Sequence, residues 1–341
     1  MSKAAISSKV FCGIDVSAAT LDAAVQRIEG DDAGFEHRQF SNSTAGHRAL
    51  IAWLLQRGVS ARATLEATGV YSFDLAVALD KAAGIEVEVL NPKIANRFAQ
   101  ALQRTKTDRA DAQALCVYSR AMKFVPWRAP DAAALALRTI GRHLATLSQE
   151  RTRQANRLEA AKGSAATPRC VLQDLKRGID ALDKRILKLR RQAVEMVRLH
   201  PELKRRFDLL VAIPGIAETS AVLILSELAS LDPDATARQW VASSGLDPVQ
   251  IKSGTSVDKP SRISRNGSRH LRRGLYMPAL VGVRFDPHLR AFYEALQRRH
   301  KTKLQALMAV ARKLLHAIYG IFKTGTAWDG AKLFPKLTPS S

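Results

Sequence analysis

Short apolar runs alternate with amphipathic stretches over residues 1–130 of the chain. Runs of four to eight apolar and β-branched residues between turn signals are typical of strands, and a repeat near 3.6 residues is typical of a helix. The pattern predicts strands at residues 10–16, 21–25, 63–67 and 85–90 and a helix at residues 71–81. The Asn91-Pro92 pair then turns the chain into a basic helical segment. Strands that alternate with helices predict an α/β domain at residues 1–130.

Residues 131–205 carry a helical pattern in which apolar residues recur at steps of three and four. This a/d repeat forms an apolar seam along one side of a helix, with charged residues elsewhere. The seam consists of Leu172, Leu175, Ile179, Leu182, Ile186, Leu189, Ala193 and Met196. An earlier helix at about residues 132–162 is in compatible phase, and residues 163–168 form a turn. The two helices could pair with each other, or the seam could pair with a second copy, so residues 131–205 are predicted to be a helical coiled-coil spacer.

Residues 206–341 are predicted to be mainly helical. A Pro214-Gly215 turn between two short helical segments is typical of a helix-hairpin-helix. Glycine allows close backbone approach there, and the amides at the next helix start could hold a phosphate. A plain turn between two helices is the alternative. Helices are also predicted at residues 287–301 and 304–322, and the apolar stripe of the second is typical of core packing. The fold class is therefore α/β plus all-α, in three domains.

The charge of the chain points to a phosphate polymer as its partner. Lys and Arg number 53 against 31 Asp and Glu, which gives a formal net charge of +22. Basic proteins bind nucleic acid by releasing its counterions. A membrane surface is the competing anion, but no run approaches 18 apolar residues and no leader opens the chain, so we expect no membrane association. The three cysteines fit neither a disulfide framework nor a zinc site, which favours the cytoplasm.

Carboxylates occur at positions where an isolated charge is costly. Asp15 and Glu66 each interrupt an apolar strand. Asp108 and Asp111 are spaced so that they share one face of a helix. Such acids could converge on divalent metal ions, for which Mg²⁺ is suited, and two metal ions can stabilise a phosphodiester displacement. Ordinary edge or surface acids are the alternative. The cations near the pair, which indicate a passing polyanion, are Arg104, Lys106 and Arg109.

A loop rich in Ser and Gly and an array of arginines follow in the C-terminal domain. Ser253-Gly254 reads as a loop, in which a serine is ordinarily only a turn residue. The arginines suit phosphate contacts, because each presents a forked set of donors. They are Arg262, Arg265, Arg269, Arg272 and Arg273.

Three segments together resemble the RuvC-like, RNase H-fold domain of the DEDD transposases of insertion sequences. They read GIDVSAATLD, LEATGVY and NPKIANRFAQALQRTKTDRADAQAL. The most specific is the K-T-D-x-x-D motif that begins at Lys106. The resemblance implies that Asp15, Glu66, Asp108 and Asp111 form the acidic quartet that binds Mg²⁺.

The segments IPGIAETSA, GLDP, KSG and RISRNGSRHLRR resemble the second, transposase-type domain of the same family. That resemblance implies that Ser253 is a nucleophile which forms a covalent 5′-phosphoserine link, with Ser243, Ser244 and Ser256 as competing assignments. It also implies donor and target DNA as substrates, a bridge RNA that supplies sequence specificity, and an oligomer, from dimer to tetramer, through the coiled-coil spacer. The expected setting is the bacterial cytoplasm, in association with the nucleoid.

Three other functions are compatible with parts of this pattern. The segment GIDVSAAT also resembles the first phosphate loop of actin-like ATPases and sugar kinases, but a second Gly-rich phosphate loop is missing from the sequence. A RuvC-like nuclease or junction resolvase would use the acids alone, with Ser253 as a structural residue. A nucleic-acid scaffold without catalysis would need neither.

Overall fold

The chain folds into two compact units, Met1–Ala129 and Pro130–Ser341. A computed structural model describes residues 9–26, 34–67, 69, 71–102, 107–254 and 256–333. The helices that the sequence sets apart as a spacer belong to the second unit. None of the helices in these described ranges is long and apolar enough to cross a membrane.

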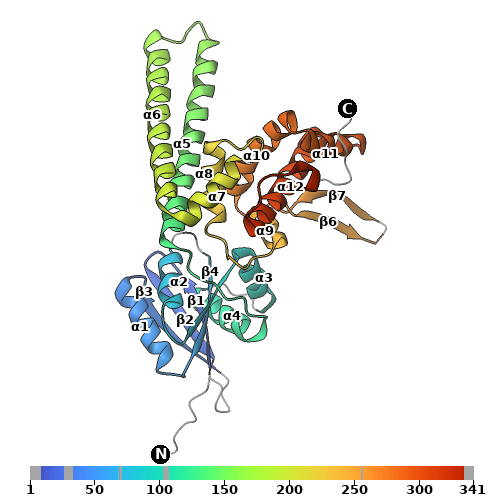
Figure 1. Cartoon of the computed structure of the whole chain (residues 1–341). Helices are drawn as coiled ribbons and strands as arrows, with labels where there is room; N and C mark the ends of the chain where they lie inside the picture. Colours follow the sequence, from blue (N-terminus) through green and yellow to red (C-terminus); the bar gives the residue numbers. More distant parts are fainter. Residues whose placement is uncertain are drawn as a thin grey trace, which may run out of the picture. The chain divides into compact units, whose positions relative to one another are not determined.

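The first unit is a mixed sheet with helices on its faces (Figure 1). The strand order is β3-β2-β1-β4-β5, in which β1 pairs antiparallel with β2 and parallel with β4. The predicted α/β character is confirmed, but the pattern missed β3 and α1. The elements are β1 (Val10–Val16), β2 (Thr20–Gln26), β3 (Phe35–Ser41), α1 (Thr44–Leu55), β4 (Ala61–Glu66), α2 (Phe73–Asp80), β5 (Ile85–Leu90), α3 (Pro92–Leu102) and α4 (Asp108–Ala121).

The two faces of this sheet differ in polarity because alternate residues of a strand point to opposite sides. On one face, Ile14 of β1 and Leu65 of β4 pack with Trp53 of α1 in a buried apolar cluster. Helix α4 lies on the other face. A side chain at Gly13 would meet the backbone of α4, with Ala112 O only 2.1 Å from the added Cβ. The helix therefore rests directly on the backbone of β1.

The second unit is mainly helical, with a small two-stranded sheet. Its elements are α5 (Ala132–Lys162), α6 (Arg169–Leu199), α7 (Pro201–Val211), α8 (Glu218–Leu228), α9 (Ala237–Ser244), β6 (Pro248–Ser253), β7 (Val257–Ile263), α10 (Arg269–Phe285), α11 (Pro287–Arg298), α12 (Lys303–Thr324) and α13 (Gly330–Leu333).

Helices α5 and α6 form a long hairpin, visible in Figure 1. The predicted seam on α6 faces α5: Ile179 and Leu182 are buried, as is Leu158 of α5. Arg151 of α5 donates two hydrogen bonds to the Asp183 carboxylate of α6, at 3.0 and 3.2 Å. Of the two pairings that the sequence left open, the structure has the intramolecular one.

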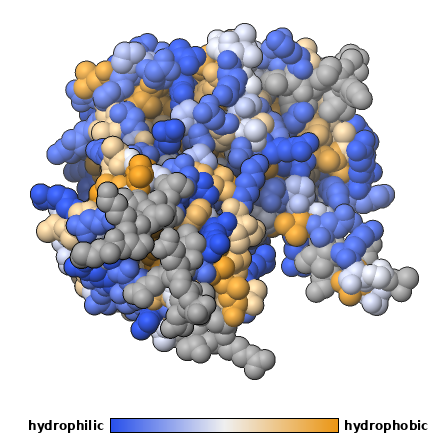
Figure 2. All heavy atoms as spheres, turned by 90° about the horizontal axis from the view of Figure 1, so that it is seen from below, coloured by the Kyte–Doolittle hydropathy of each residue, from blue (hydrophilic) through white to orange (hydrophobic). Residues whose placement is uncertain are grey.

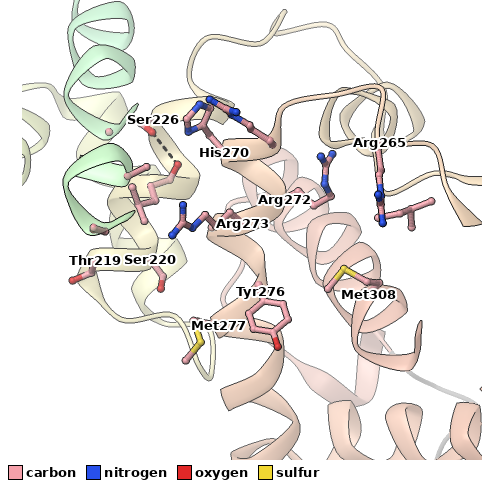
Figure 3. A pocket seen from close by; sticks show the side chains of 17 residues that line it. Thr219, Ser220, Ser226, Arg265, His270, Arg272, Arg273, Tyr276, Met277 and Met308 are labelled. Carbon is pink, nitrogen blue, oxygen red and sulfur yellow. Dashed lines mark hydrogen bonds between the residues drawn. The ribbon is translucent and has the colours of Figure 1, made fainter. Parts of the chain in front are cut away.

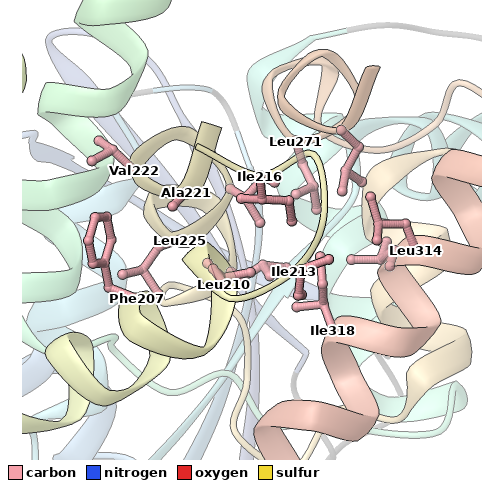
Figure 4. Packing of buried hydrophobic residues seen from close by; sticks show 14 of the residues in the cluster. Phe207, Leu210, Ile213, Ile216, Ala221, Val222, Leu225, Leu271, Leu314 and Ile318 are labelled. Atoms are coloured by element: carbon pink, nitrogen blue, oxygen red, sulfur yellow. The ribbon is translucent and has the colours of Figure 1, made fainter. Parts of the chain in front are cut away.

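The core of the second unit lies among α7, α8, α10 and α12 (Figure 4). Leu210, Leu225 and Leu314 are fully buried there. The turn between α7 and α8 contributes Ile213 and Ile216, which are also buried. The apolar stripe predicted on the last long helix, α12, is thus confirmed as a core face.

The ribbon β6–β7 and the long helix α10 correct the sequence prediction for this unit. The prediction of a mainly helical unit is confirmed, but the all-α class leaves out a ribbon in which residues 248–253 pair antiparallel with residues 257–263. The alternation in β6 was masked by Pro248 at its start and by the polar, proline-containing sequence of β7. The basic array that follows is mostly helical, since α10 begins at Arg269.

Candidate active site and nucleic-acid interface

Two of the predicted acids lie side by side on the sheet. Ile14 of β1 pairs with Leu65 of β4 in parallel register, so the next residues, Asp15 and Glu66, occupy neighbouring positions. Asp15 lies two residues after Gly13, and Glu66 lies two residues after Thr64, the residue of β4 that pairs with Gly13. Both side chains therefore leave the sheet on the face that α4 covers. The strands run in the same direction, so both carboxylates reach the same edge of the sheet.

The other two acids lie in the first turn of α4. Thr107 caps this helix, and its hydroxyl accepts a hydrogen bond from the Ala110 amide at 3.2 Å. Asp108 and Asp111 follow in the first turn, where the positive end of the helix dipole favours carboxylates. The contact of α4 with Gly13 brings this turn to the polar face of β1.

The four acids interact electrostatically. Burial, together with the negative charges of Asp108, Asp111 and Glu66, raises the pKa of Asp15 from 3.8 to about 6. Residues from two other segments, β4 and α4, thus act on the carboxyl group of Asp15. Like charges held together in this way favour a proton or a cation between them.

The chemistry of this acidic quartet fits a divalent cation, because every donor is a carboxylate oxygen. A cation would also relieve the repulsion that raises the pKa of Asp15. Within the described ranges, no three His, Cys, Asp or Glu side chains are arranged so that they could hold a metal ion as they stand.

Further acids that sequence reasoning missed lie on the same face. Asp22 of β2 is the cross-strand partner of Asp15 and is buried. Its carboxylate lies 2.9 Å from His37 Nε2 and accepts from Gln39 Nε2 at 3.2 Å. Glu88 of β5 is also buried, and burial raises its pKa. Period-two spacing would have placed both acids on the face of Asp15.

The serines differ in their accessibility. Ser253 ends β6 opposite Val257, at the turn of the β-ribbon, and is exposed. Its hydroxyl makes no hydrogen bond with any described residue. By contrast, Ser243 and Ser244 donate back to the backbone of their own helix, at 2.8 and 2.7 Å. Ser256, on the other side of the turn, is exposed as well.

Four of the five predicted arginines line one cavity of about 650 Å³ between α8 and α10. Figure 3 shows Arg273 extending from α10 toward the side of α8 that carries Ser220. Arg262 does not line it and lies on β7. The four lining arginines are Arg265, Arg269, Arg272 and Arg273.

The remaining predicted nucleic-acid contacts lie elsewhere. Arg109 is exposed in the first turn of α4, whereas Arg104 and Lys106 fall outside the described residues. Gly215 has a φ of 90°, and a Cβ there would come within 2.7 Å of the Pro278 carbonyl of α10. The close approach allowed by this glycine is therefore to the protein's own helix.

An ion pair with a buried carboxylate holds the start of α10 in position. Arg142 of α5 donates to both oxygens of Glu227, at 2.7 and 3.1 Å, and Ser268 donates to the same carboxylate at 2.7 Å. Burial alone would raise the pKa of Glu227, but these hydrogen bonds hold it below its usual value. Ser268 is also the N-cap of α10. The arginine-bearing helix is thus tied to α5 and α8.

Hydrophilic residues make up most of the molecular face in Figure 2, with hydrophobic residues in separate groups. An acidic quartet beside a sheet and a basic, mainly helical unit together are typical of enzymes that act on DNA phosphodiesters.

Comparison with known proteins defines the family. Residues 12–161 match the family model described as a transposase of the DEDD, IS110 type, and residues 207–294 match that of the IS116/IS110/IS902 transposases. A pilin gene-inverting protein of Moraxella bovis is 28% identical over 333 residues, which cover 94% of this chain and 98% of that protein. An IS110 protein of Streptomyces coelicolor is 26% identical over 159 residues, 47% of this chain and 38% of the relative.

These matches identify a DNA recombinase, an enzyme that cleaves and rejoins DNA strands. The chain belongs to the IS110/IS116/IS902 family of insertion-sequence transposases. Its substrate is therefore DNA, and membership of the DEDD class indicates dependence on a divalent metal ion.

Proposed function

We propose that this chain carries out strand exchange between donor and target DNA with two groups of its own, the acidic quartet and the Ser253 hydroxyl. The observation that supports this most directly is the action of Glu66, Asp108 and Asp111 on the pKa of Asp15. Four acids gathered at a sheet edge suit a phosphoryl transfer site. The relative from Moraxella bovis is named for the inversion of a pilin gene, which is also a strand exchange.

In the proposed reaction, Ser253 Oγ attacks a DNA phosphorus. The Oγ–P bond forms and the P–O3′ bond breaks, so that a 5′-phosphoserine and a free 3′ hydroxyl result. The serine proton passes to a water-borne base, and the leaving 3′ oxygen takes up a proton. The reverse attack by a 3′ hydroxyl of the other duplex restores Ser253 and a phosphodiester. The number of ester bonds is unchanged, so no nucleotide cofactor is needed.

The quartet would hold Mg²⁺, which suits carboxylate ligands and phosphate substrates. When bound, the ion would stabilise negative charge on the phosphate oxygens. The chain's own contribution is the placement of Asp15 and Glu66 on β1 and β4, with Asp108 and Asp111 on α4. Closure of these side chains around a cation would remove the repulsion on Asp15.

Sequence specificity would come from a bridge RNA that pairs with donor and target DNA. Base pairing then selects the sites, and the protein needs only to recognise the backbones. A net charge of +22 spread along the chain suits this division of labour. If the proposal holds, RNA copurifies with the chain, and ribonuclease treatment abolishes recombination but leaves nonspecific DNA binding.

We also propose an oligomer, from dimer to tetramer, in which the acidic unit of one copy and the serine of another form a composite site. The seam of α6 is engaged with α5, so contacts between copies would use the outer faces of the hairpin. Val171 and Leu187, which are exposed on α6, lie on such faces. Replacing both by Glu should lower the mass in sedimentation without unfolding the chain.

Trapping of a covalent protein–DNA adduct tests the serine. Ser253→Ala should abolish the adduct and strand exchange, whereas Ser256→Ala, at the other exposed serine of the same turn, should leave both intact. Asp15→Asn and Glu66→Gln should abolish metal-dependent activity but retain DNA binding. Undiminished strand exchange by the Ser253→Ala variant rules out the mechanism.

A second candidate is a nuclease or junction resolvase in which the acids alone direct hydrolysis. The absence of a hydrogen bond between the Ser253 hydroxyl and any described residue favours it, because a nucleophilic serine is ordinarily activated by a neighbouring base. This candidate predicts cleaved DNA without an adduct, and equal cleavage by the wild type and Ser253→Ala.

A further inference from the structure

The cavity between α8 and α10 is lined by arginines at one end and by apolar side chains further along. Arginines occupy the part near the start of α10, as Figure 3 shows. Further along the same helix, Tyr276 and Met277 line it, and Met308 of α12 lies opposite. Tyr276 is 38% exposed and Met277 is 52% exposed, so large apolar side chains here face solvent.

The arginines of this cavity differ in whether they make hydrogen bonds with the rest of the protein. Arg272 donates to the Ser244 carbonyl at 2.6 Å and is part of the wall. Arg269 and Arg273 are exposed and make no hydrogen bond or ion pair with the described residues. They are four residues apart, so they share one face of α10. Two guanidinium groups are therefore available for an anion at one end of the cavity.

The opposite wall adds neutral polar groups. Thr219 and Ser220 lie in the first turn of α8 and line the cavity across from Arg273. The Thr219 hydroxyl accepts a hydrogen bond from Arg190 at 3.1 Å. Hydroxyls at this position suit a sugar or a phosphate oxygen.

We propose that this cavity holds one unstacked nucleotide of a single strand, with its phosphate on Arg269 and Arg273 and its base against Tyr276 and Met277. The inference extends the proposed function, because it assigns a subsite for nucleic acid. A volume of about 650 Å³ accommodates one nucleotide. Base stacking on an aromatic side chain is the usual way in which proteins hold single strands.

A duplex backbone does not use this combination of groups. Phosphates of a duplex lie on its outside and need only exposed cations, and its bases stay stacked out of reach of a side chain. Contact with a duplex would leave Tyr276 and Met277 facing water. A single strand satisfies both halves of the cavity, whether it is DNA opened during exchange or an RNA loop.

Fluorescence anisotropy with the full chain tests the proposal. The Ser253→Ala variant serves as background, so that binding is measured apart from the proposed chemistry. The probes are a single-stranded DNA, a single-stranded RNA and a DNA duplex of equal length, and the tighter single strand identifies the natural source. Tyr276→Ala should weaken single-strand binding about five- to a hundredfold, equivalent to about 1–3 kcal/mol, and duplex binding less than about twofold.

Matched variants keep the result interpretable. Tyr276→Phe retains the ring and should bind as the wild type does. Phe285→Ala removes a 75% exposed aromatic side chain from the same helix outside the cavity and should have no effect. Met277→Glu, which places a carboxylate in the apolar half, should abolish single-strand binding without unfolding the chain. Arg273→Gln should lower the salt slope of single-strand binding by about 0.7.

Equal losses from Tyr276→Ala and Phe285→Ala would overturn the proposal. So would an equal loss of duplex and single-strand binding in Tyr276→Ala, which would indicate a plain phosphate surface. These outcomes concern binding alone, and the adduct test that compares the wild type with Ser253→Ala decides the serine mechanism separately.

Discussion

Replacement of Asp15 by Asn should stabilise the first unit in the absence of metal. The pKa of Asp15 is raised from 3.8 to about 6, so the ionised carboxylate opposes folding at neutral pH. A pKa unit corresponds to about 1.4 kcal/mol, which gives an upper value of about 3 kcal/mol. Asp15 is only partly buried, and solvent screening reduces this to about 1–2 kcal/mol. We expect a rise of roughly 3 °C or more in Tm.

Thermal unfolding in EDTA at pH 7.5, and again at pH 5, measures this effect. The pKa of Asp15 is higher in the folded state, so its penalty is present above about pH 6 and disappears as the pH falls toward 4. The difference between variant and wild type should therefore shrink at pH 5. Adding Mg²⁺ should stabilise the wild type more than Asp15→Asn, because the ion binds the folded carboxylates.

Asp22→Asn is the matched control, since Asp22 is the cross-strand neighbour of Asp15. Its carboxylate is stabilised by His37 and Gln39, so its replacement should lower Tm. A lower Tm for Asp15→Asn in EDTA, or a difference from the wild type that is unchanged between pH 7.5 and 5, would refute the electrostatic reasoning about the quartet.

Four further variants test the packing of the two units. Gly13→Ala should destabilise the first unit by about 3 kcal/mol or more in urea unfolding, because the new Cβ meets the backbone of α4 at 2.1 Å. Gly320→Ala, with nothing within 4 Å, should instead stabilise α12 by about 0.5–1 kcal/mol; destabilisation there would contradict the packing. Glu227→Gln should cost about 1.5–3 kcal/mol in thermal unfolding, because Arg142 and Ser268 would lose a charged acceptor while Arg142 stays in contact with water. The pKa of Glu227 is lowered in the folded state, so the wild type should lose its advantage over the variant below about pH 4.5, as Glu227 is protonated. Equal pH profiles of stability for both chains would argue against this role of Glu227. Arg151→Ala breaks a pair that is 44% and 49% exposed and should cost less than about 1 kcal/mol by the same measurement, so a larger loss would mean that the hairpin depends on it.

The two strands that carry Asp15 and Glu66 could be predicted because each is an apolar run interrupted by one acid. β5 was predicted with its observed bounds, Ile85–Leu90, and the helix predicted at residues 132–162 matches α5. β3 was missed because it is an edge strand with a polar sequence, of which only Phe40 is buried. Alternation and helical period report burial, and an edge strand has little of it.

The cavity in the second unit could not be predicted from the arginines alone. The sequence analysis predicted no helix at the array, yet α10 begins at Arg269 and runs through Pro278 to Phe285. Without that helix, nothing in the sequence brings Tyr276 to the same face as Arg273. The tie from Glu227 to Ser268, which fixes where α10 begins, joins residues 41 positions apart and leaves no local signal.

The contact at Gly13 fixes the distance between the two strands that carry Asp15 and Glu66 and the helix that carries Asp108 and Asp111. Two main chains touch there with no side chain between them, so the gap between the strand acids and the helix acids is set by atomic radii. Substitutions that repack the apolar face under α1 and α2 can alter stability without widening that gap. A single methyl group at residue 13 would widen it, and the site would then be lost even with all four of its carboxylates intact.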